Sequence, residues 1–304
     1  MILVTGGLGM IGAHTARALV DLGHEVIVTS HRRADVPSFL AGRVTVQSLD
    51  VTDRNAFLAL GSRYDISDIV HLAGTIPGED PVDFFRSDTA GLLNALDVAR
   101  AWGVRRFAVA SSIGVYIGRT EIRWDENLAL PTADLPHLIV AFKKAVEPLT
   151  THSLQGSGVQ PVVLRIGSIW GPLMDPESPF NPIPPYVSAV LRGERPRPLD
   201  ANFGGDWCYA PDAGRAIALL TTAETLRHDT YNVSSGRPAF HRDFADALQA
   251  ITPDPDLLPA QQAGPGDDPY LDTTRLTHDT GFAPAFDIAG AIADYVAWRA
   301  DNPR

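Results

Sequence analysis

A glycine-rich segment at the start of the chain has the residue types and the spacing to hold a dinucleotide. It reads Thr5-Gly6-Gly7-Leu8-Gly9-Met10-Ile11-Gly12, and it lies between an apolar run that predicts a strand and a periodic stretch that predicts a helix. We expect Gly7 to allow the tight turn, Gly9 to let the backbone approach a pyrophosphate, and Gly12 to let helix and strand pack closely. The N–H groups at the start of the helix would then face the anion.

The end of the second predicted strand bears on which dinucleotide is bound. Folds that prefer NAD carry an acidic residue there, about 20 residues after the glycines, to bind the ribose 2′-OH. In this chain Thr29 holds that place, and Ser30, His31, Arg32 and Arg33 follow it. Hydroxyl and guanidinium groups suit a 2′-phosphate, so we expect NADP(H) in preference to NAD(H). The alternative is that the two arginines are only a solvated basic loop.

The elements that must position this turn alternate along the first half of the chain. Apolar β-branched runs predict strands at residues 2–5, 25–29, 44–48, 69–72, 107–110 and 162–166, and amphipathic stretches predict helices at 11–22 and 91–102. Strands that alternate with helices indicate a parallel sheet. The expected fold class is α/β, a Rossmann-type doubly wound parallel sheet with a small C-terminal substrate-binding lobe.

The same pattern predicts how the chain is divided. We expect a dinucleotide-binding domain at residues 1–170, with a strand and a helix returning to it around 205–235, and the smaller lobe at residues 171–304. Prolines crowd residues 172–185, which we interpret as a loop over the site because proline disrupts helix interiors and central strands. The alternative is a solvated connector.

Composition disfavours several kinds of partner. A formal net charge of -11 and a pI of about 5.2 would repel phosphate backbones and anionic lipids, so we expect neither nucleic acid nor membrane as a partner. Cys208 is the only cysteine, which excludes an intramolecular disulfide and a thiolate metal cluster and fits a reducing, cytoplasmic location. We expect no metal site, no secretion signal and no membrane span.

Six segments in order resemble the extended short-chain dehydrogenase/reductase family, in the branch of nucleotide-sugar epimerases and dehydratases. They are Leu-Asp-Val-Thr-Asp at 49–53, His-Leu-Ala-Gly at 71–74, Ser-Ser-Ile-Gly-Val-Tyr at 111–116, the region 165–172, Tyr-Asn-Val-Ser-Ser-Gly at 231–236, and Gly-Phe-Ala-Pro at 281–284. The resemblance covers nearly the whole chain. Beyond the residues already discussed, it implies cofactor contacts from Asp50, Val51, Leu72, Ala73, Gly74, Ser111, Lys143, Ile166 and Ser168.

The resemblance also implies the chemistry, which is hydride transfer at a carbonyl or carbinol assisted by serine, tyrosine and lysine. It assigns Ser112 to hold the substrate oxygen and Lys143 to grip the nicotinamide ribose and lower the tyrosine pKa. The family's Tyr-x-x-x-Lys then places Ile139 where the tyrosine is expected, and isoleucine can neither donate nor accept a proton.

Two other residues are candidates for the missing acid. Tyr116 lies just after Ser112, and His137 lies two residues before Ile139. Each also has a non-catalytic interpretation. Tyr116 in relatives is a wall residue of the site, and His137 follows a proline, as a polar loop residue would.

A second departure from the family concerns the substrate. Nucleotide-sugar members carry an arginine before the aspartate of a late motif, where it binds the diphosphate, whereas this chain has Gly205 before Asp206. Five aromatic residues fall in segments that surround the substrate in relatives, and they favour an aromatic ligand unless they are core residues. They are Trp170, Phe180, Tyr186, Trp207 and Tyr209.

The leading hypothesis is therefore an NAD(P)H-dependent ketoreductase that reduces a bulky aromatic or polyketide ketone in antibiotic biosynthesis. Among members without the tyrosine, the chain is similar to angucyclinone ketoreductases, and a substrate phenol or water would supply the proton. A nucleotide-sugar epimerase or dehydratase and a non-catalytic NAD(P) sensor are the alternatives, the latter disfavoured because Ser112 and Lys143 are retained. The resemblance further implies a homodimer through residues 91–102 and 136–151.

Overall fold

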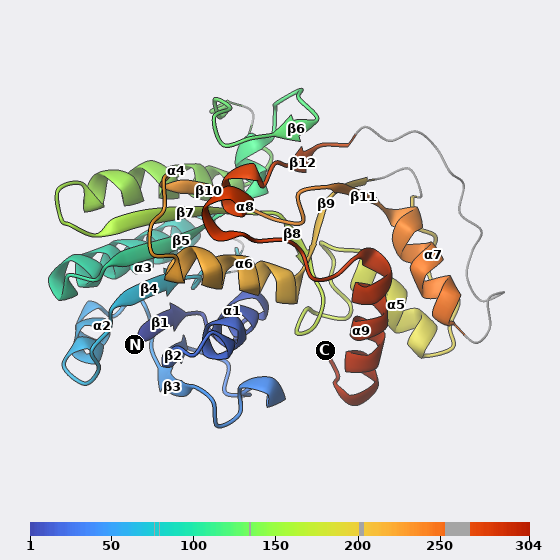
Figure 1. The fold of residues 1–304 in the computed structure, drawn as a ribbon, viewed down its shortest axis with the longest axis horizontal. Helices are drawn as coiled ribbons and strands as arrows, with labels where there is room; N and C mark the ends of the chain where they lie inside the picture. Colours follow the sequence, from blue (N-terminus) through green and yellow to red (C-terminus); the bar gives the residue numbers. More distant parts are fainter. Residues whose placement is uncertain (76, 79, 134, 201–203, 253–267) are drawn as a thin grey trace.

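Seven parallel strands form the main sheet, in the order β10-β7-β5-β4-β1-β2-β3 (Figure 1). The computed structural model describes residues 1–75, 77–78, 80–133, 135–200, 204–252 and 268–304. The strands are β1 Ile2–Thr5, β2 Val26–Ser30, β3 Thr45–Ser48, β4 Asp68–His71, β5 Arg106–Ser112, β7 Gln160–Ile166 and β10 Thr230–Val233. The strand order reverses between β1 and β4, which opens a crevice at their carboxyl ends. The predicted doubly wound α/β fold is confirmed.

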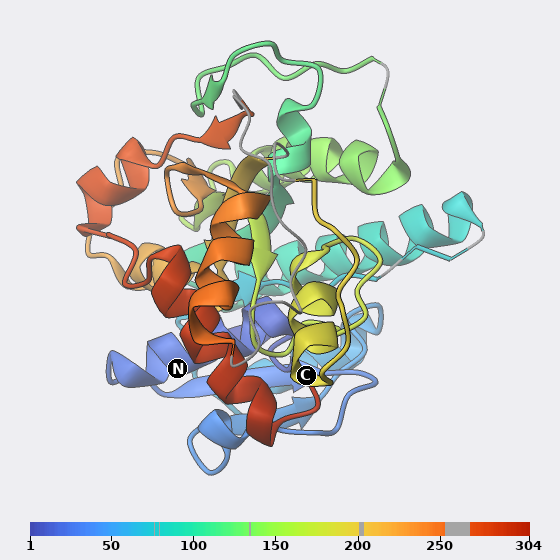
Figure 2. The same ribbon diagram turned by 90° about the vertical axis from the view of Figure 1, so that its right-hand side faces the viewer.

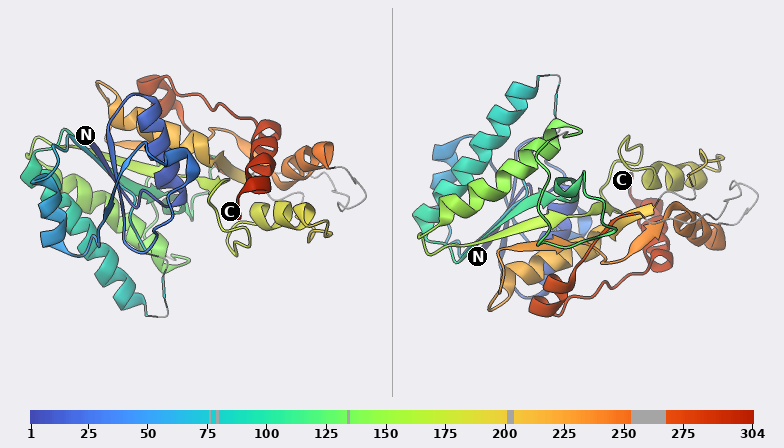
Figure 3. Two further views of the ribbon diagram at one scale, coloured as in Figure 1. Left: turned by 90° about the horizontal axis from the view of Figure 1, so that it is seen from below. Right: turned by 90° about the horizontal axis from the view of Figure 1, so that it is seen from above.

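Helices cover both faces of this sheet (Figure 3). On one face lie α1 (Met10–Asp21) and α6 (Ala210–Thr222), and on the other lie α2 (Arg54–Gly61), α3 (Pro81–Trp102) and α4 (Leu138–Leu154). Successive strand residues point to opposite faces, so that Leu3 packs with the second group of helices and Val4 with the first. Because both faces are buried, the strands read as continuous apolar runs in the sequence.

Helix α3 begins at Pro81, ten residues before the predicted start at residue 91. The Asp80 side chain accepts hydrogen bonds from the backbone N–H groups of Val82 and Asp83, and Pro81 occupies the first turn, where its missing N–H costs nothing. The helix ends at Trp102, and the next residue, Gly103, has a left-handed φ of 63°. Capping residues, not apolar periodicity, therefore set the beginning of α3.

The C-terminal part of the chain forms a separate small layer beside the main sheet (Figure 2). Its sheet contains β8 (Ser168–Trp170), β9 (Gly204–Tyr209) and β11 (Pro238–Phe240), and its helices are α5 (Ile183–Leu191), α7 (His241–Ile251) and α9 (Ile288–Asp301). A two-stranded pair, β6 (Arg123–Trp124) with β12 (Tyr270–Leu271), and helix α8 (Thr274–Thr280) connect it to the rest. Two short 3₁₀ helices, η1 (Ser38–Leu40) and η2 (Ile113–Tyr116), complete the elements. No described helix is both long and apolar enough to cross a bilayer.

The proline-rich stretch is not a loop over its whole predicted length. Helix α5 begins at Ile183, so that Pro184 and Pro185 lie in its first turn. Proline fits there because the first N–H groups of a helix have no partner within the helix. The predicted loop at residues 172–185 is therefore wrong in its last three residues.

Candidate active site

A cleft of about 520 Å³ lies around the glycine turn, at the carboxyl ends of β1, β2 and β4. Its position is the crevice where the strand order of the sheet reverses. Eleven of the residues predicted to bind the cofactor line it. They are Gly6, Gly9, Ser30, His31, Arg32, Arg33, Asp50, Val51, Leu72, Ala73 and Gly74.

The glycines of the turn have two different tasks. Gly6 is the left-handed residue, with φ of 65°, whereas a Cβ on Gly7 would lie 2.5 Å from Cβ of Val28. Gly7 lies in the turn as predicted, but the left-handed conformation belongs to Gly6, and the absence of a side chain at Gly7 also allows contact with β2. A Cβ on Gly12 would lie 2.4 Å from the carbonyl oxygen of Gly6, so Gly12 lets α1 approach the turn. Gly9 faces the cleft.

The start of α1 fits the pyrophosphate of a dinucleotide. Its N-cap residue, Gly9, offers no side-chain hydrogen bond, and its first turn contains no acidic residue. The first N–H groups and the positive end of the helix dipole are thus available to an anion. Met10 and Ile11 pack against the apolar core instead. The side chain of Thr5 is buried, and its hydroxyl accepts a hydrogen bond from the backbone N–H of Ala73.

The structure weakens the case for a 2′-phosphate site. The guanidinium of Arg33 donates to the carbonyl oxygen of Leu8 at 2.9 Å, and the Ser30 hydroxyl donates to the carbonyl of Arg33 at 2.7 Å. Both side chains are thus hydrogen-bonded to backbone carbonyl groups, whereas Arg32 is exposed at the cleft. Hydrogen bonds from Thr52 to the Asp50 side chain hold the pKa of that carboxyl below its usual range, so a negative charge faces the same region.

Further residues line the cleft that the sequence interpretation did not name as cofactor contacts. They are Thr29, Leu49, Thr52, His71, Thr75, Ser87, Asp88 and Gly91. The hydroxyl of Thr75 donates to the Asp88 carboxylate at 2.7 Å. Ser87 and Asp88 lie in the first turns of α3, which the predicted helix did not include. The Asp80-Pro81 capping signal was available in the sequence and would have extended that helix to them.

Lys143 and Ser112 each form a hydrogen bond with the backbone near the carboxyl end of β5. The Lys143 amine donates to the carbonyl oxygen of Ala110 at 2.7 Å, and the Ser112 hydroxyl accepts a hydrogen bond from the backbone N–H of Gly114 at 3.1 Å. Burial lowers the pKa of Lys143 to about 8, although the nearby Asp88 carboxylate opposes the shift. Neither residue lines the cleft itself, but Lys143 lies beside Asp88 and His71, which do.

Neither candidate for a replacement acid, Tyr116 or His137, is hydrogen-bonded to this pair within the described residues. Ile139 packs against the apolar core, and His137 is exposed at the N-cap of α4. Tyr116 is fully buried, and its hydroxyl donates to the Asn232 side chain at 2.9 Å and accepts from Arg165 at 2.8 Å. Burial raises the pKa of Tyr116 to about 12. The suggestion that Tyr116 serves as the acid is therefore wrong, because a buried, doubly bonded hydroxyl cannot reach a substrate.

A buried ion pair holds α4 against the strands. Arg165 donates to both carboxylate oxygens of Glu147, at 3.0 and 2.8 Å, and the Ser111 hydroxyl donates to the same carboxylate at 2.6 Å. Ser111 therefore contacts Glu147 and does not line the cofactor cleft, and the cleft likewise excludes Ile166 and Ser168. Glu147 follows Lys143 by one helical turn, so the pair fixes the helix that carries the lysine.

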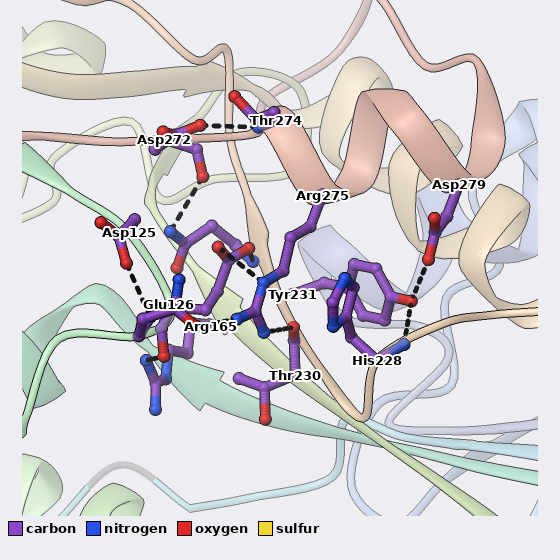
Figure 4. Close-up of polar contacts among 12 residues, drawn as sticks. Asp125, Glu126, Arg165, His228, Thr230, Tyr231, Asp272, Thr274, Arg275 and Asp279 are labelled. Carbon is purple, nitrogen blue, oxygen red and sulfur yellow. Dashed lines mark hydrogen bonds and ion pairs between the residues drawn. The ribbon is translucent and has the colours of Figure 1, made fainter.

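The network continues from Arg165 into the C-terminal part of the chain (Figure 4). The Asn232 backbone N–H donates to the Glu126 carboxylate at 2.8 Å, and Arg275 of α8 lies 3.6 Å from the same carboxylate. The Tyr231 hydroxyl donates to Asp279 of α8 at 2.6 Å. These contacts tie α8 to the edge strand β10 and, through Tyr116 and Arg165, to β7.

Most of the aromatic residues predicted to bind substrate form the core of the small lobe. The Trp170 ring lies 4.9 Å from the Tyr209 ring and 5.1 Å from Phe244, and Trp170, Tyr186 and Tyr209 are each less than 5% exposed. Trp207 packs on Phe244 as well. Trp170, Trp207 and Tyr209 therefore act in packing, because the lobe needs large apolar side chains to bury its few elements.

Phe180 differs from these residues, since its side chain is 83% exposed. It lines a groove of about 690 Å³ between α5 and the segment that follows it, with Tyr186 in one wall. Arg195 and Arg197 line the same groove, and neither forms an ion pair within the described residues.

Asp206, the aspartate next to Gly205, is fully buried where β9 meets β12. Its carboxylate accepts hydrogen bonds from the Ser234 hydroxyl and from the backbone N–H of Leu271, yet burial raises its pKa to about 7. A raised carboxyl pKa stabilises the fold at low pH, and this contribution is lost as pH rises through 7. The free energy of unfolding of Asp206→Asn, minus that of the wild type, should therefore be about 1 kcal/mol higher at pH 8 than at pH 6. Urea unfolding at both pH values measures this, and exposed Asp246→Asn, the control, should show no such difference.

Comparison with known proteins gives the family. The model of the NAD dependent epimerase/dehydratase family matches residues 2–234. The chain is 26% identical to UDP-glucose 4-epimerase of Mus musculus, over 99% of this chain and 97% of that one. It is 27% identical to dTDP-glucose 4,6-dehydratase of Streptomyces griseus, over 98% of this chain and 93% of that one.

Solved structures agree in fold. UDP-glucose 4-epimerase of Thermotoga maritima, solved with UDP-glucose, superposes with a TM-score of 0.82 at 23% identity and covers 100% of this chain and 99% of its own. UDP-glucose 4-epimerase of Thermus thermophilus, solved with NAD, has a TM-score of 0.80 at 26% identity and covers 99% of both chains.

These comparisons overturn the predicted ketoreductase function, together with its polyketide substrate and its place in antibiotic biosynthesis. The relatives are named for nucleotide sugars. The expected preference for NADP(H) also lacks support, since the neighbours solved with cofactor hold NAD. The hypothesis rested on the missing tyrosine, on Gly205 in place of the family arginine, and on aromatic residues that the structure places in the core of the lobe. With a family model that matches residues 2–234, the chain belongs to the NAD dependent epimerase/dehydratase family.

Proposed function

We propose that this protein is a nucleoside-diphosphate-sugar epimerase that works with bound NAD. The observation that carries the proposal is full-length similarity to UDP-glucose 4-epimerases, in a chain whose cleft fits a dinucleotide next to Lys143 and Ser112. When bound, the nicotinamide accepts a hydride from a sugar carbon and returns it. Similar identity to a dTDP-glucose 4,6-dehydratase makes dehydration of a nucleotide sugar the second candidate.

The loop after β2 supports NAD over NADP. Arg33 and Ser30 are engaged with backbone groups, and the Asp50 carboxylate would repel a 2′-phosphate. Titration calorimetry with NAD and NADP on protein freed of cofactor tests the choice, and tighter binding of NADP would contradict it.

The groove beside α5 supports a nucleoside diphosphate. An exposed aromatic ring, Phe180, can stack on a base, and two arginines without ion-pair partners in the described chain can bind a diphosphate. The family motif has an arginine where this chain has Gly205, and Arg195 and Arg197 could make its contact with the diphosphate instead. This arrangement answers the objection that the sequence raised against a nucleotide sugar.

Turnover of a small panel of sugars tests the function directly. The purified protein is incubated with UDP-glucose, UDP-galactose, UDP-glucuronate and dTDP-glucose, and products are identified by proton NMR. Epimerisation of one of them is the expected result. Loss of water from dTDP-glucose would favour the second candidate, and failure to convert any of them would contradict both.

Substitution of the groove arginines should weaken substrate binding more than catalysis. We expect Arg195→Ser with Arg197→Ser to raise KM about tenfold, equivalent to about 1.4 kcal/mol, with kcat changed less than threefold. Steady-state kinetics measure the two constants. Arg63→Gln, an exposed arginine on another surface, serves as the control and should leave both unchanged. An unchanged KM in the double variant would place the nucleotide elsewhere.

A further inference from the structure

The chain contains only two lysines, Lys143 and Lys144, among its 25 basic residues. The other 23 are arginines, which stay protonated at every physiological pH. The Lys144 amine donates to the carbonyl oxygen of Pro131, in the segment before α4. Lys143 is therefore the one basic side chain beside the cleft that can both lose and regain a proton easily, apart from histidine.

The surroundings of Lys143 are mostly apolar or already engaged. One of its three N–H groups is bonded, to Ala110, within the described structure. The charged or titratable groups that face it are His71 from β4 and Asp88 from α3. Glu147, one turn later on its own helix, is bonded to Arg165 of β7 and Ser111 of β5.

Within the described part of the chain, neither a tyrosine nor the titratable groups that face Lys143 are suited to proton transfer. All seven tyrosines lie in that part, and none lines the cleft. Burial lowers the pKa of His71 to about 3, and its Nδ1 atom is hydrogen-bonded to Thr5. The Asp88 carboxylate already accepts hydrogen bonds from Thr75.

We propose that Lys143 itself transfers the proton of the substrate, in addition to any contact with the cofactor. The inference rests on the proposed function. As the carbinol becomes a carbonyl, its O–H proton would pass to the neutral amine of Lys143, while bound NAD would supply the hydride acceptor. In the return step the ammonium of Lys143 would give the proton back to the oxygen, so that the neutral amine is regenerated.

The pKa of Lys143 agrees with this role. Burial brings it to about 8, so that both the amine and the ammonium are populated near neutral pH. An ordinary lysine, with a pKa of about 10.4, would be a poor base at that pH. Charge on Lys143 in turn helps to keep His71 neutral.

The first test measures the titration of Lys143 without requiring turnover. Reductive methylation with ¹³C-formaldehyde labels only two lysines and the chain terminus, so each NMR signal can be assigned with Lys143→Arg and Lys144→Arg. The signal lost in Lys143→Arg should titrate near pH 8. A midpoint within about half a unit of the ordinary lysine value, about 10.4, would overturn the proposal, whether or not any sugar is converted.

The second test separates acid–base catalysis from positioning. Lys143→Ala should lower kcat at least about 1,000-fold, and added primary amines should restore part of it, with rates that follow the amine pKa. Lys144→Ala is the control and should stay within about threefold of the wild type. Activity of Lys143→Ala within tenfold of the wild type, or no rescue by any amine, would overturn the role of Lys143. Failure of the wild type to convert any nucleotide sugar would instead contradict the proposed function.

Discussion

Replacing Arg165 with methionine should lower the free energy of unfolding by about 3–5 kcal/mol. The substitution leaves the Glu147 carboxylate buried with Ser111 as its remaining partner, and it also removes the donor to the Tyr116 hydroxyl. An unpaired buried charge is costly because it has lost its water without gaining a counter-ion. Urea denaturation followed by circular dichroism measures the loss.

Two further variants show whether the charge is the cause. Glu147→Leu added to Arg165→Met removes the stranded carboxylate and should recover at least half of the lost stability. Arg192→Met breaks an exposed pair with Glu177 and should cost less than about 1 kcal/mol. If the double variant were as unstable as the single one, packing and not charge would explain the loss.

Gly12→Ala should weaken dinucleotide binding by about 100-fold, which corresponds to about 2.7 kcal/mol. The new Cβ would lie 2.4 Å from the carbonyl oxygen of Gly6 and 2.8 Å from Cα of Gly7, so α1 must move away from the turn. The N–H groups that face the pyrophosphate move with it. Calorimetry with NAD measures the affinity, and thermal unfolding should show a lower melting temperature as well.

Gly9→Ala separates binding from packing. Its Cβ would contact only the Gly6 oxygen, at 3.2 Å, and would otherwise enter the cleft. We expect about tenfold weaker binding with the melting temperature unchanged. Gly78→Ala, which meets no atom within 4 Å, is the control. Equal affinities for Gly9→Ala and the wild type would show that the pyrophosphate does not approach Gly9.

If Lys143 transfers the proton, Ile139 in place of the family tyrosine does not leave the reaction without an acid. An isoleucine one turn before the lysine left the reaction without a recognisable acid, which favoured unusual substrates in the sequence interpretation. Ile139 packs against the apolar core, and Lys143, one turn later, lies in desolvated surroundings. The homodimer through α3 and α4 stays a prediction.

The sequence by itself was enough to predict the dinucleotide-binding fold, because the signals for it lie within short stretches of the chain. The glycine turn, the apolar strands and the lysine of α4 are recognisable within a few residues, since steric limits and burial on both faces act on neighbours in the chain. Only the tertiary structure decided which residues share a site. It separated Tyr116 and Trp170, which are buried, from Phe180 and Asp88, which line a groove or a cleft. Burial and electrostatic environment depend on elements far apart in sequence, so the spacing of residues along the chain could not supply them.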